Sequence, residues 1–276
     1  MKLALAQLDI VWEDKTKNKE TAIQFIKHAT TENVDIIFFP EMTLTGFSVN
    51  TSLIGEDNNE TVEFFKEMSS KFNIFIGFGY VEGRTNSKNK YSVVAPPVVH
   101  GGVPRVMHRD VPQDKTLVTY TKIHPFSFGC ETEFYQSGNK INYFNAFNFT
   151  IVPFICYDLR FPEIFQIASK TATLITIAAN WPIDRRDHWI TLLKARAIEN
   201  QCYIAGINRI GEGNGLTYSG DSMIVDPLGN VISNLYMDEG LVIADISEEN
   251  VTQIREKFRL KSDRKESLYC ELFSSN

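Results

Sequence analysis

One cysteine, Cys156, stands where the pattern of the sequence would place a nucleophile. The apolar run 152–155 precedes it, and Pro162 and Glu163 follow it in an order typical of the first turn of a helix. Near a helix N-terminus, unpaired backbone N–H groups favour a thiolate and lower the pKa of a thiol from its ordinary value of about 8.5. Cys156 is therefore a candidate nucleophile; the alternative is that it is only a small buried apolar residue.

Attack by a thiol on an amide needs a base and donors for the oxyanion, because an amide is a poor electrophile. Glu41 follows the apolar run 34–39, where loss of solvation would raise the pKa of its carboxyl group and suit it to a general base. Lys122 offers an ammonium group to the oxyanion, and the backbone N–H of Tyr157 offers a second donor. Each residue has an alternative interpretation when it is considered alone. Glu41 could be an exposed acid at the end of a strand, and Lys122 could be a solvated surface lysine.

Arg160 lies four residues beyond the candidate nucleophile and is the best indication of the substrate. Its guanidinium can bind a carboxylate through two parallel hydrogen bonds. A small substrate that carries a carboxylate would fit such a site. The alternative is that Arg160 pairs with Asp158 or Glu163 and only braces the turn.

Strand and helix patterns alternate through the first third of the chain. An apolar strand over 2–11 precedes an amphipathic helix around 22–29. The continuous apolar run 34–39 predicts a strand buried on both faces. A helix over 60–72 and a strand over 74–81 follow.

The rest of the chain predicts further strands with helices between them. After the proline-rich stretch 96–117, a hairpin over 142–148 and 150–155 leads to the candidate nucleophile. The later elements are helices over 161–169, 188–200 and 248–258, and strands over 173–179, 202–208, 221–225, 231–234 and 241–246. Two β-rich layers covered by helices predict an α/β protein with four-layer αββα packing. We expect a single domain over 1–276, in which 259–276 form a charged, broken tail.

The composition excludes several classes of protein. Among 276 residues, 43% are hydrophobic and 22% charged, as in soluble globular proteins, and the net charge of −6 argues against a nucleic-acid surface. No apolar run reaches the ~18 residues of a membrane span, so a cytoplasmic protein is the default expectation. The four cysteines and five histidines show no metal-ligand spacing, and neither a metal site nor a disulfide framework is indicated.

Three segments together resemble the nitrilase, or carbon–nitrogen hydrolase, superfamily. They are 38–47, 120–124 and 154–163, one around each of the three candidate residues. The resemblance implies the nitrilase-type αββα sandwich and an amidase whose glutamate, lysine and cysteine come from separate strand ends. Glu41 would pass the thiol proton of Cys156 to the leaving ammonia, and a thioester would form. Water activated by Glu41 would then release the acid, with no metal or organic cofactor.

The resemblance also implies a second glutamate, a few residues before a Gly-Asn or Gly-Asp pair, that positions the lysine and the substrate. Glu131 takes that place because of its distance from Gly138 and Asn139. Glu133 is its near rival.

The segments 178–182, 188–189 and 194–201 resemble the ω-amidase branch of the superfamily. Enzymes of that branch hydrolyse the terminal amide of 2-oxoglutaramate and 2-oxosuccinamate. Trp181 would wall the substrate pocket, although core packing is what a large aromatic residue does more often. The stretch 96–117 is longer than the hairpin expected there and leaves the shape of the pocket on that side open.

The resemblance further implies a homodimer, with the helix after Cys156 and the C-terminal segment as contact surfaces. Other functions stay open at this point. The nearest is an amidase of the same superfamily that acts on deaminated glutathione or an N-carbamoyl compound. A non-catalytic binding protein on this scaffold is another, and a thiol redox protein is a third, although no resolving cysteine lies close to Cys156 in the sequence.

Overall fold

The computed structural model describes residues 1–97 and 116–275, and in these residues two β-sheets face each other. The first sheet has the strand order β13-β1-β2-β3-β4-β5, and the second has the order β10-β11-β9-β8-β7-β6, with β12 paired to β11. The strands of the first sheet are β1 (Lys2–Gln7), β2 (Ile36–Phe38), β3 (Phe75–Glu82), β4 (Lys88–Val94), β5 (Thr116–Thr121) and β13 (Gly240–Asp245). Those of the second are β6 (Phe144–Ala146), β7 (Phe149–Ile155), β8 (Leu174–Ala179), β9 (Tyr203–Asn208), β10 (Ile210–Gly213), β11 (Leu216–Val225) and β12 (Val231–Tyr236).

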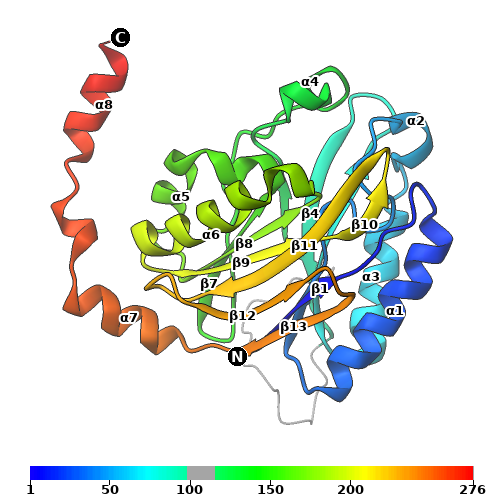
Figure 1. Ribbon diagram of the computed structural model, residues 1–276, viewed down its shortest axis with the longest axis horizontal. Helices are drawn as coiled ribbons and strands as arrows, with labels where there is room; N and C mark the ends of the chain where they lie inside the picture. Colours follow the sequence, from blue (N-terminus) through cyan, green and yellow to red (C-terminus); the bar gives the residue numbers. More distant parts are fainter. Residues whose placement is uncertain (98–115, 276) are drawn as a thin grey trace.

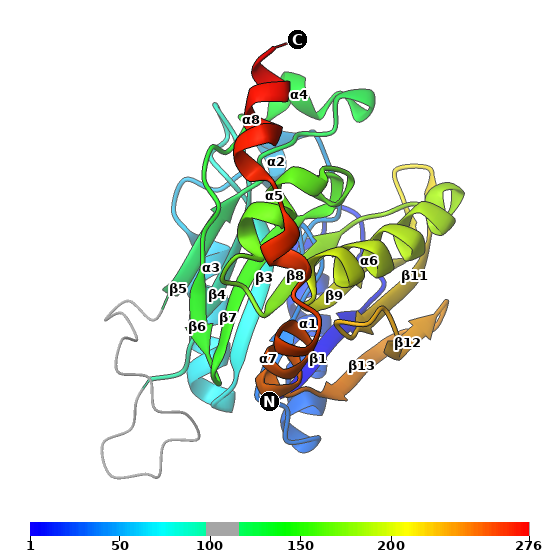
Figure 2. The ribbon, with the colours of Figure 1, turned by 90° about the vertical axis from the view of Figure 1, so that its left-hand side faces the viewer.

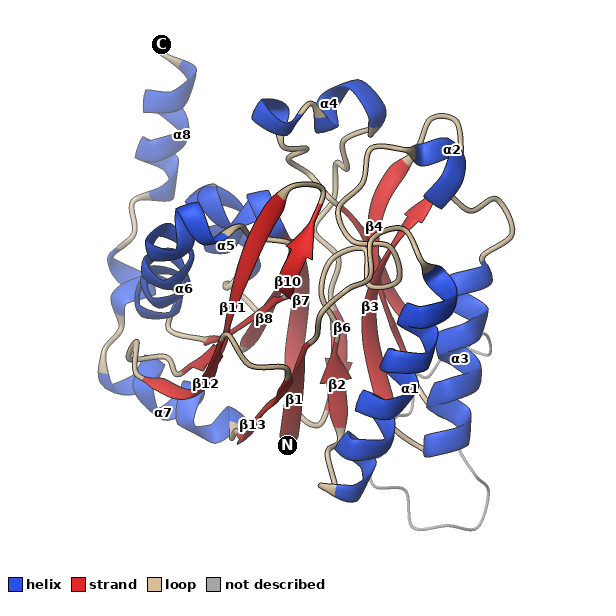
Figure 3. Ribbon diagram, turned by 45° about the vertical axis from the view of Figure 1, so that its right-hand side comes forward, coloured by secondary structure: helices blue, strands red, loops and turns tan. Residues whose placement is uncertain are grey.

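Helices cover the outer face of each sheet (Figures 1 and 3). The first sheet is covered by α1 (Lys15–Thr31) and α3 (Glu60–Phe72), and the second by α5 (Pro162–Ala168) and α6 (Arg186–Asn200). Shorter or peripheral helices are α2 (Thr51–Ile54), α4 (Glu131–Phe134), α7 (Glu248–Lys257) and α8 (Glu266–Ser274). The four layers confirm the predicted αββα sandwich.

Successive side chains of a strand point alternately to the two faces of its sheet, and this explains how the layers pack. In β1, Leu3 and Leu5 belong to the apolar cluster between the two sheets, whereas Ala4 and Ala6 belong to the cluster under α1 and α3. Successive side chains of a strand point to opposite faces, so a strand covered on both faces must be apolar throughout. The buried run that leads to Glu41 satisfies this requirement.

Strand direction places the candidate residues at one edge. In the first sheet β2 is parallel to β3, and β5 is antiparallel to β4, which is itself antiparallel to β3. The C-terminal ends of β2 and β5 therefore meet at the same edge, where Glu41 and Lys122 follow them. In the second sheet β7 and β8 are parallel and deliver Cys156 and Asn180 at their C-terminal ends.

Most predicted elements are confirmed, with shifted ends. The helix over 60–72 has the predicted bounds, and the predicted hairpin forms from β6 and β7. The predicted strand over 2–11 ends at Gln7, after which only an isolated bridge joins Asp9 to Ile210. Of the stretch 96–117, residues 98–115 lie outside the described part of the chain.

The prediction of a broken C-terminal tail was wrong. A 3₁₀ turn over Leu260–Asp263 leads into helix α8, which extends beyond the body of the molecule and passes α5 (Figures 1 and 2). Apolar side chains one turn apart, such as Leu268 and Leu272, give this segment a helical face. Among the described residues, no helix is long and apolar enough to cross a membrane.

Candidate active site

Cys156 occupies a sharp turn between strand β7 and helix α5. Its backbone has a φ of +43°, a left-handed conformation that is uncommon and costly for a residue with a side chain. A 3₁₀ turn over Cys156–Arg160 follows, and the buried carboxylate of Asp158 accepts a 3.1 Å hydrogen bond from the backbone N–H of Ile155. The turn thus holds the thiol at the top of the strand, where the sequence analysis expects a nucleophile.

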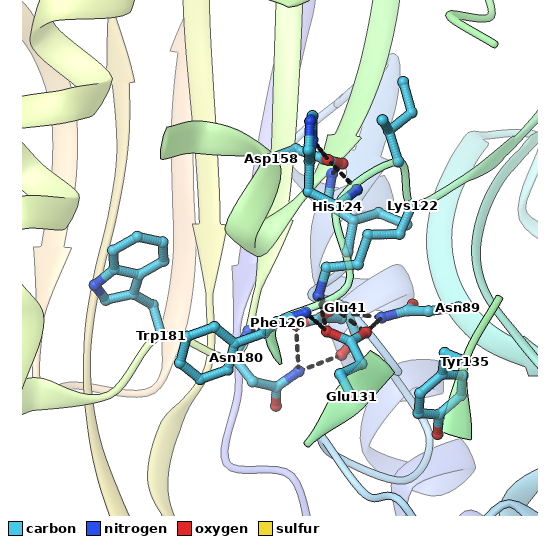
Figure 4. Close-up of polar contacts among 12 residues, drawn as sticks. Glu41, Asn89, Lys122, His124, Phe126, Glu131, Tyr135, Asp158, Asn180 and Trp181 are labelled. Atoms are coloured by element: carbon cyan, nitrogen blue, oxygen red, sulfur yellow. Dashed lines mark hydrogen bonds and ion pairs between the residues drawn. The ribbon is translucent and has the colours of Figure 1, made fainter. Parts of the chain in front are cut away.

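Lys122 lies between two buried carboxylates (Figure 4). Its Nζ is 2.9 Å from Oε1 of Glu41 and 2.7 Å from Oε2 of Glu131. Burial alone would lower the pKa of Lys122, but the charges of Glu131 and Glu41 together raise it well above its ordinary value. Lys122 is therefore a permanent cation in this site, and not the solvated surface lysine of the alternative interpretation.

The structure distinguishes the two candidates for the second glutamate. Glu131 is fully buried, pairs with Lys122, and also accepts a 2.6 Å hydrogen bond from the backbone N–H of Phe126. Glu133 lies on the exposed side of helix α4. Of these two candidates, Glu131 is the one that contacts Lys122.

Two asparagines that the sequence analysis did not select hold Glu41 in place (Figure 4). The side-chain amide of Asn89 donates to Oε1 of Glu41 at 2.7 Å and to Oε1 of Glu131 at 3.0 Å. The backbone N–H of Asn180 donates to Oε2 of Glu41 at 3.1 Å. The only sequence signal for Asn89 is the alternation of β4, which puts it on the opposite face from Lys88 and Lys90.

The expectation of a lowered thiol pKa was wrong. Burial raises the pKa of Cys156 well above its ordinary value and the charge of Glu41 raises it further, while Lys122 opposes the rise. The helix-terminus argument fails because regular helix begins only at Pro162, and the residues between form a 3₁₀ turn. The raised pKa favours the neutral thiol, and after burial the charge of Glu41 is the largest cause of the rise.

Cys156 lines a narrow cleft with an accessible volume of about 50 Å³. Its aromatic walls are Phe47, Phe126, Tyr157, Trp181 and Tyr218. Its polar lining consists of Lys122, Cys156, Arg160, Asn180 and Arg185, and Pro182 and Leu216 complete it. Trp181 is both a wall of this cleft and a packed residue, since its ring lies 5.5 Å from that of Trp189.

Arg160 does not pair with Asp158 or Glu163, as the alternative interpretation required. Its guanidinium lies 4.7 Å above the ring of Trp181, and its Nη2 is 3.3 Å from Nδ1 of His188. Within residues 1–97 and 116–275, no carboxylate forms an ion pair with it, and Asp158 is instead engaged by His124. The guanidinium therefore lines the cleft with its charge uncompensated.

No metal site accompanies this arrangement in the part of the chain that the structure describes. There, no three side chains of His, Cys, Asp or Glu are grouped so as to hold a metal ion. Lys122 occupies the space between the two buried carboxylates.

Comparisons with known proteins place this geometry in a family. A model of the carbon–nitrogen hydrolase family matches residues 2–256. The chain is 30% identical to a 2-oxoglutaramate amidase of Bacillus subtilis over 97% of its own length and 98% of the relative's. It is 32% identical to an omega-amidase of Escherichia coli K12, over 96% of its own length and 97% of the relative's.

Solved structures agree with the sequence comparison. A CN-hydrolase superfamily protein from Xanthomonas campestris, which carries an arsenic adduct in its active site, superposes with a TM-score of 0.84 at 26% identity. The match covers 96% of this chain and 97% of that one. An amidase from Nesterenkonia superposes with a TM-score of 0.83 at 19% identity, over 99% and 96% of the two chains, and shares the fold.

Proposed function

This chain belongs to the carbon–nitrogen hydrolase family, and from that premise we propose that it hydrolyses the terminal amide of small 2-oxo dicarboxylic acid monoamides. 2-Oxoglutaramate and 2-oxosuccinamate are the expected substrates, and the acid and ammonia are the products. The observation that carries the proposal is that Glu41 and Glu131 both pair with Lys122, which lines a cleft together with the Cys156 thiol and the unpaired guanidinium of Arg160. The names of the two amidase relatives support the choice of substrate.

We assign the catalytic steps as follows. Glu41 takes the proton of the Cys156 thiol while the sulfur attacks the amide carbon, and the carbonyl oxygen becomes an oxyanion. The ammonium of Lys122 and the backbone N–H of Tyr157 stabilise that oxyanion. Glu41 returns the proton to the amide nitrogen, so that ammonia leaves and a thioester remains. Glu41 then takes a proton from water, and the resulting hydroxide attacks the thioester carbon so that the C–S bond breaks. Glu41 returns that proton to the sulfur, which restores the Cys156 thiol as the acid is released.

The raised pKa of Cys156 agrees with this order of steps. A preformed thiolate would not need the adjacent carboxylate, whereas a neutral thiol does. Glu131 neither gives nor takes a proton in this scheme. Its role is to hold Lys122 against the reacting oxygen.

Arg160 and Trp181 are the proposed substrate-binding residues. The guanidinium would bind the carboxylate of the substrate, and the aromatic walls would enclose its short carbon chain. The contact with the ring of Trp181 and the 3.3 Å hydrogen bond to Nδ1 of His188 hold the guanidinium of Arg160 in one orientation, and its remaining N–H groups can bind a ligand.

Ammonia release from 2-oxoglutaramate, glutamine and an N-carbamoyl amino acid, measured side by side, tests the proposal. We expect 2-oxoglutaramate to be hydrolysed with the highest kcat/KM, and Cys156→Ala to abolish turnover. A preference for the N-carbamoyl compound would favour the alternative amidase. Turnover of none of them would favour a binding protein, and full activity of Cys156→Ala would refute the thioester.

A homodimer is also part of the proposal. Helix α5 exposes Ile167, and α8 exposes Leu268, Tyr269, Leu272 and Phe273. Residues of α5 and α8 line a common groove, in which a second copy of the chain would cover this apolar surface. Light scattering should give twice the chain mass, and removal of residues 266–276 should shift the protein toward the monomer. A monomeric full-length chain would contradict the assignment.

A cytoplasmic location completes the proposal. Cys130, Cys156, Cys202 and Cys270 are all free thiols, which is typical of proteins in a reducing compartment. Fractionation of the cells that produce the protein would test it, and recovery outside the cytoplasm would contradict it.

A further inference from the structure

A second guanidinium lines the cleft besides that of Arg160. It belongs to Arg185, the last residue of a 3₁₀ turn over Ile183–Arg185 that leads into helix α6. In the described residues, no carboxylate forms an ion pair with Arg185. Its neighbour Arg186 behaves differently, since it binds both carboxylate oxygens of Asp221 at 2.7 and 2.9 Å.

Aromatic rings hold both cleft guanidiniums in position without neutralising them. Arg160 lies over Trp181 at 4.7 Å from the ring centre, and Arg185 lies over Phe126 at 5.5 Å. Burial lowers the pKa of Arg160, and the charge of Arg185 lowers it further. The two cations therefore repel each other within the cleft, and an anion bound near both would offset that repulsion.

We propose that Arg185 is a second specificity-determining residue, which together with Arg160 binds the carboxylate and the adjacent oxo oxygen of the substrate. This inference rests on the proposed function and makes it more specific. One guanidinium can use one edge of a carboxylate, which leaves further acceptor sites on that group and on the oxo oxygen. The cleft should accordingly prefer amides that carry a carboxylate and an oxo group over amides that carry only a carboxylate. Uncharged amides should bind least well.

Arg185→Met tests the inference because it removes the charge and keeps a side chain of similar length. The backbone oxygen of Arg185, which accepts a 2.7 Å hydrogen bond from the indole of Trp181, does not depend on the side chain. The substrates are 2-oxoglutaramate, glutaramate without the oxo group, and uncharged pentanamide. The control is Lys194→Gln, which removes an exposed positive charge from α6.

We expect Arg185→Met to raise the KM for 2-oxoglutaramate by ~10- to 100-fold, the effect of losing a charged hydrogen bond. The KM for glutaramate should rise less, and that for pentanamide should stay unchanged. Lys194→Gln should match the wild type, and Arg185→Lys should lie between the wild type and Arg185→Met. Equal losses on all three amides, or no loss on 2-oxoglutaramate, would overturn the inference.

A binding experiment separates this inference from the proposed function. If the wild-type protein releases no ammonia from 2-oxoglutaramate, the proposed function fails, but the cleft can still be probed with 2-oxoglutarate. This anion should slow alkylation of Cys156 by iodoacetamide in the wild type, and should do so about tenfold less effectively in Arg185→Met. Equal protection of the two proteins, or no protection of the wild type, would overturn the role of Arg185.

Discussion

The hydroxyl of Tyr120 donates a 2.8 Å hydrogen bond to Oδ2 of the buried Asp158. This bond joins the strand that ends just before Lys122 to the turn that carries Cys156. His124 strengthens the connection, because its backbone N–H and its Nδ1 lie 3.0 and 2.8 Å from Oδ1 of Asp158. Two segments that come from different sheets are thereby held at a set separation.

Tyr120→Phe should therefore impair catalysis more than its distance from the cleft suggests. Burial and then the charge of Asp158 raise the pKa of Tyr120 well above its ordinary value, so the hydroxyl is a donor at every working pH. We expect kcat to fall by roughly tenfold and the free energy of unfolding by about 1–3 kcal/mol. Steady-state kinetics and urea unfolding measure the two effects.

Tyr203→Phe is the matched control for that variant. The Tyr203 hydroxyl accepts a 3.0 Å hydrogen bond from Asn250 and is not among the residues that line the cleft. The variant Tyr203→Phe should lose stability, but its kcat should not change. If Tyr120→Phe also kept its kcat, the hydrogen bond to Asp158 would serve stability alone.

Asn89→Asp should disable the site through charge. The buried cluster of Glu41, Glu131 and Lys122 has two carboxylates and one ammonium, and a third carboxylate would add an uncompensated negative charge. We expect kcat/KM to fall by about 100-fold with a clear loss of stability. Asn145→Asp, on an exposed strand position, makes the same change of charge and should behave like the wild type. Comparable losses in both variants would point to net charge as the cause.

Lys122→Met should destabilise the protein as well as inactivate it. Removal of the ammonium leaves Glu41 and Glu131 buried without a counter-charge, at a cost of about 3–5 kcal/mol in the free energy of unfolding. Lys122→Met combined with Glu131→Gln should regain part of that stability and none of the activity. Denaturant unfolding measures the stability of the variants, and ammonia release measures their activity. A stable single variant would mean that solvent or rearrangement compensates the carboxylates.

Alkylation of Cys156 should require alkaline pH. The raised pKa of the thiol keeps it protonated above the range in which an ordinary cysteine ionises, so the rate of reaction with iodoacetamide should still rise beyond about pH 9. Glu41→Gln removes a negative charge that raises this pKa and should move the midpoint of the profile to lower pH. Mass spectrometry of the peptide that contains Cys156 gives the rate. A profile that is flat from neutral pH upward would show a thiolate at rest.

The sequence by itself determined most of the elements, although not their ends, and it placed Glu41 and Cys156 just after buried strands. The helix Glu60–Phe72 follows from the spacing of its apolar residues, and the runs before Glu41 and Cys156 follow from strands covered on both faces. These signals are local, because burial on one face of a helix or both faces of a strand repeats along a few consecutive residues. The set of glutamate, lysine and cysteine came instead from the resemblance of the segments 38–47, 120–124 and 154–163 to the carbon–nitrogen hydrolase superfamily.

The tertiary structure decided the chemistry of the site. Asn180 reaches Glu41 across 139 residues of chain, Asn89 joins two carboxylates from a segment with no motif, and the thiol pKa changes opposite to the helix-terminus expectation. Solvation and charge interactions depend on every group within a few ångströms, whatever its place in the chain. Only the packing of one sheet on the other brings those groups together. The pKa values of the site residues and the lack of a carboxylate partner for Arg185 among the described residues are therefore properties of the folded molecule.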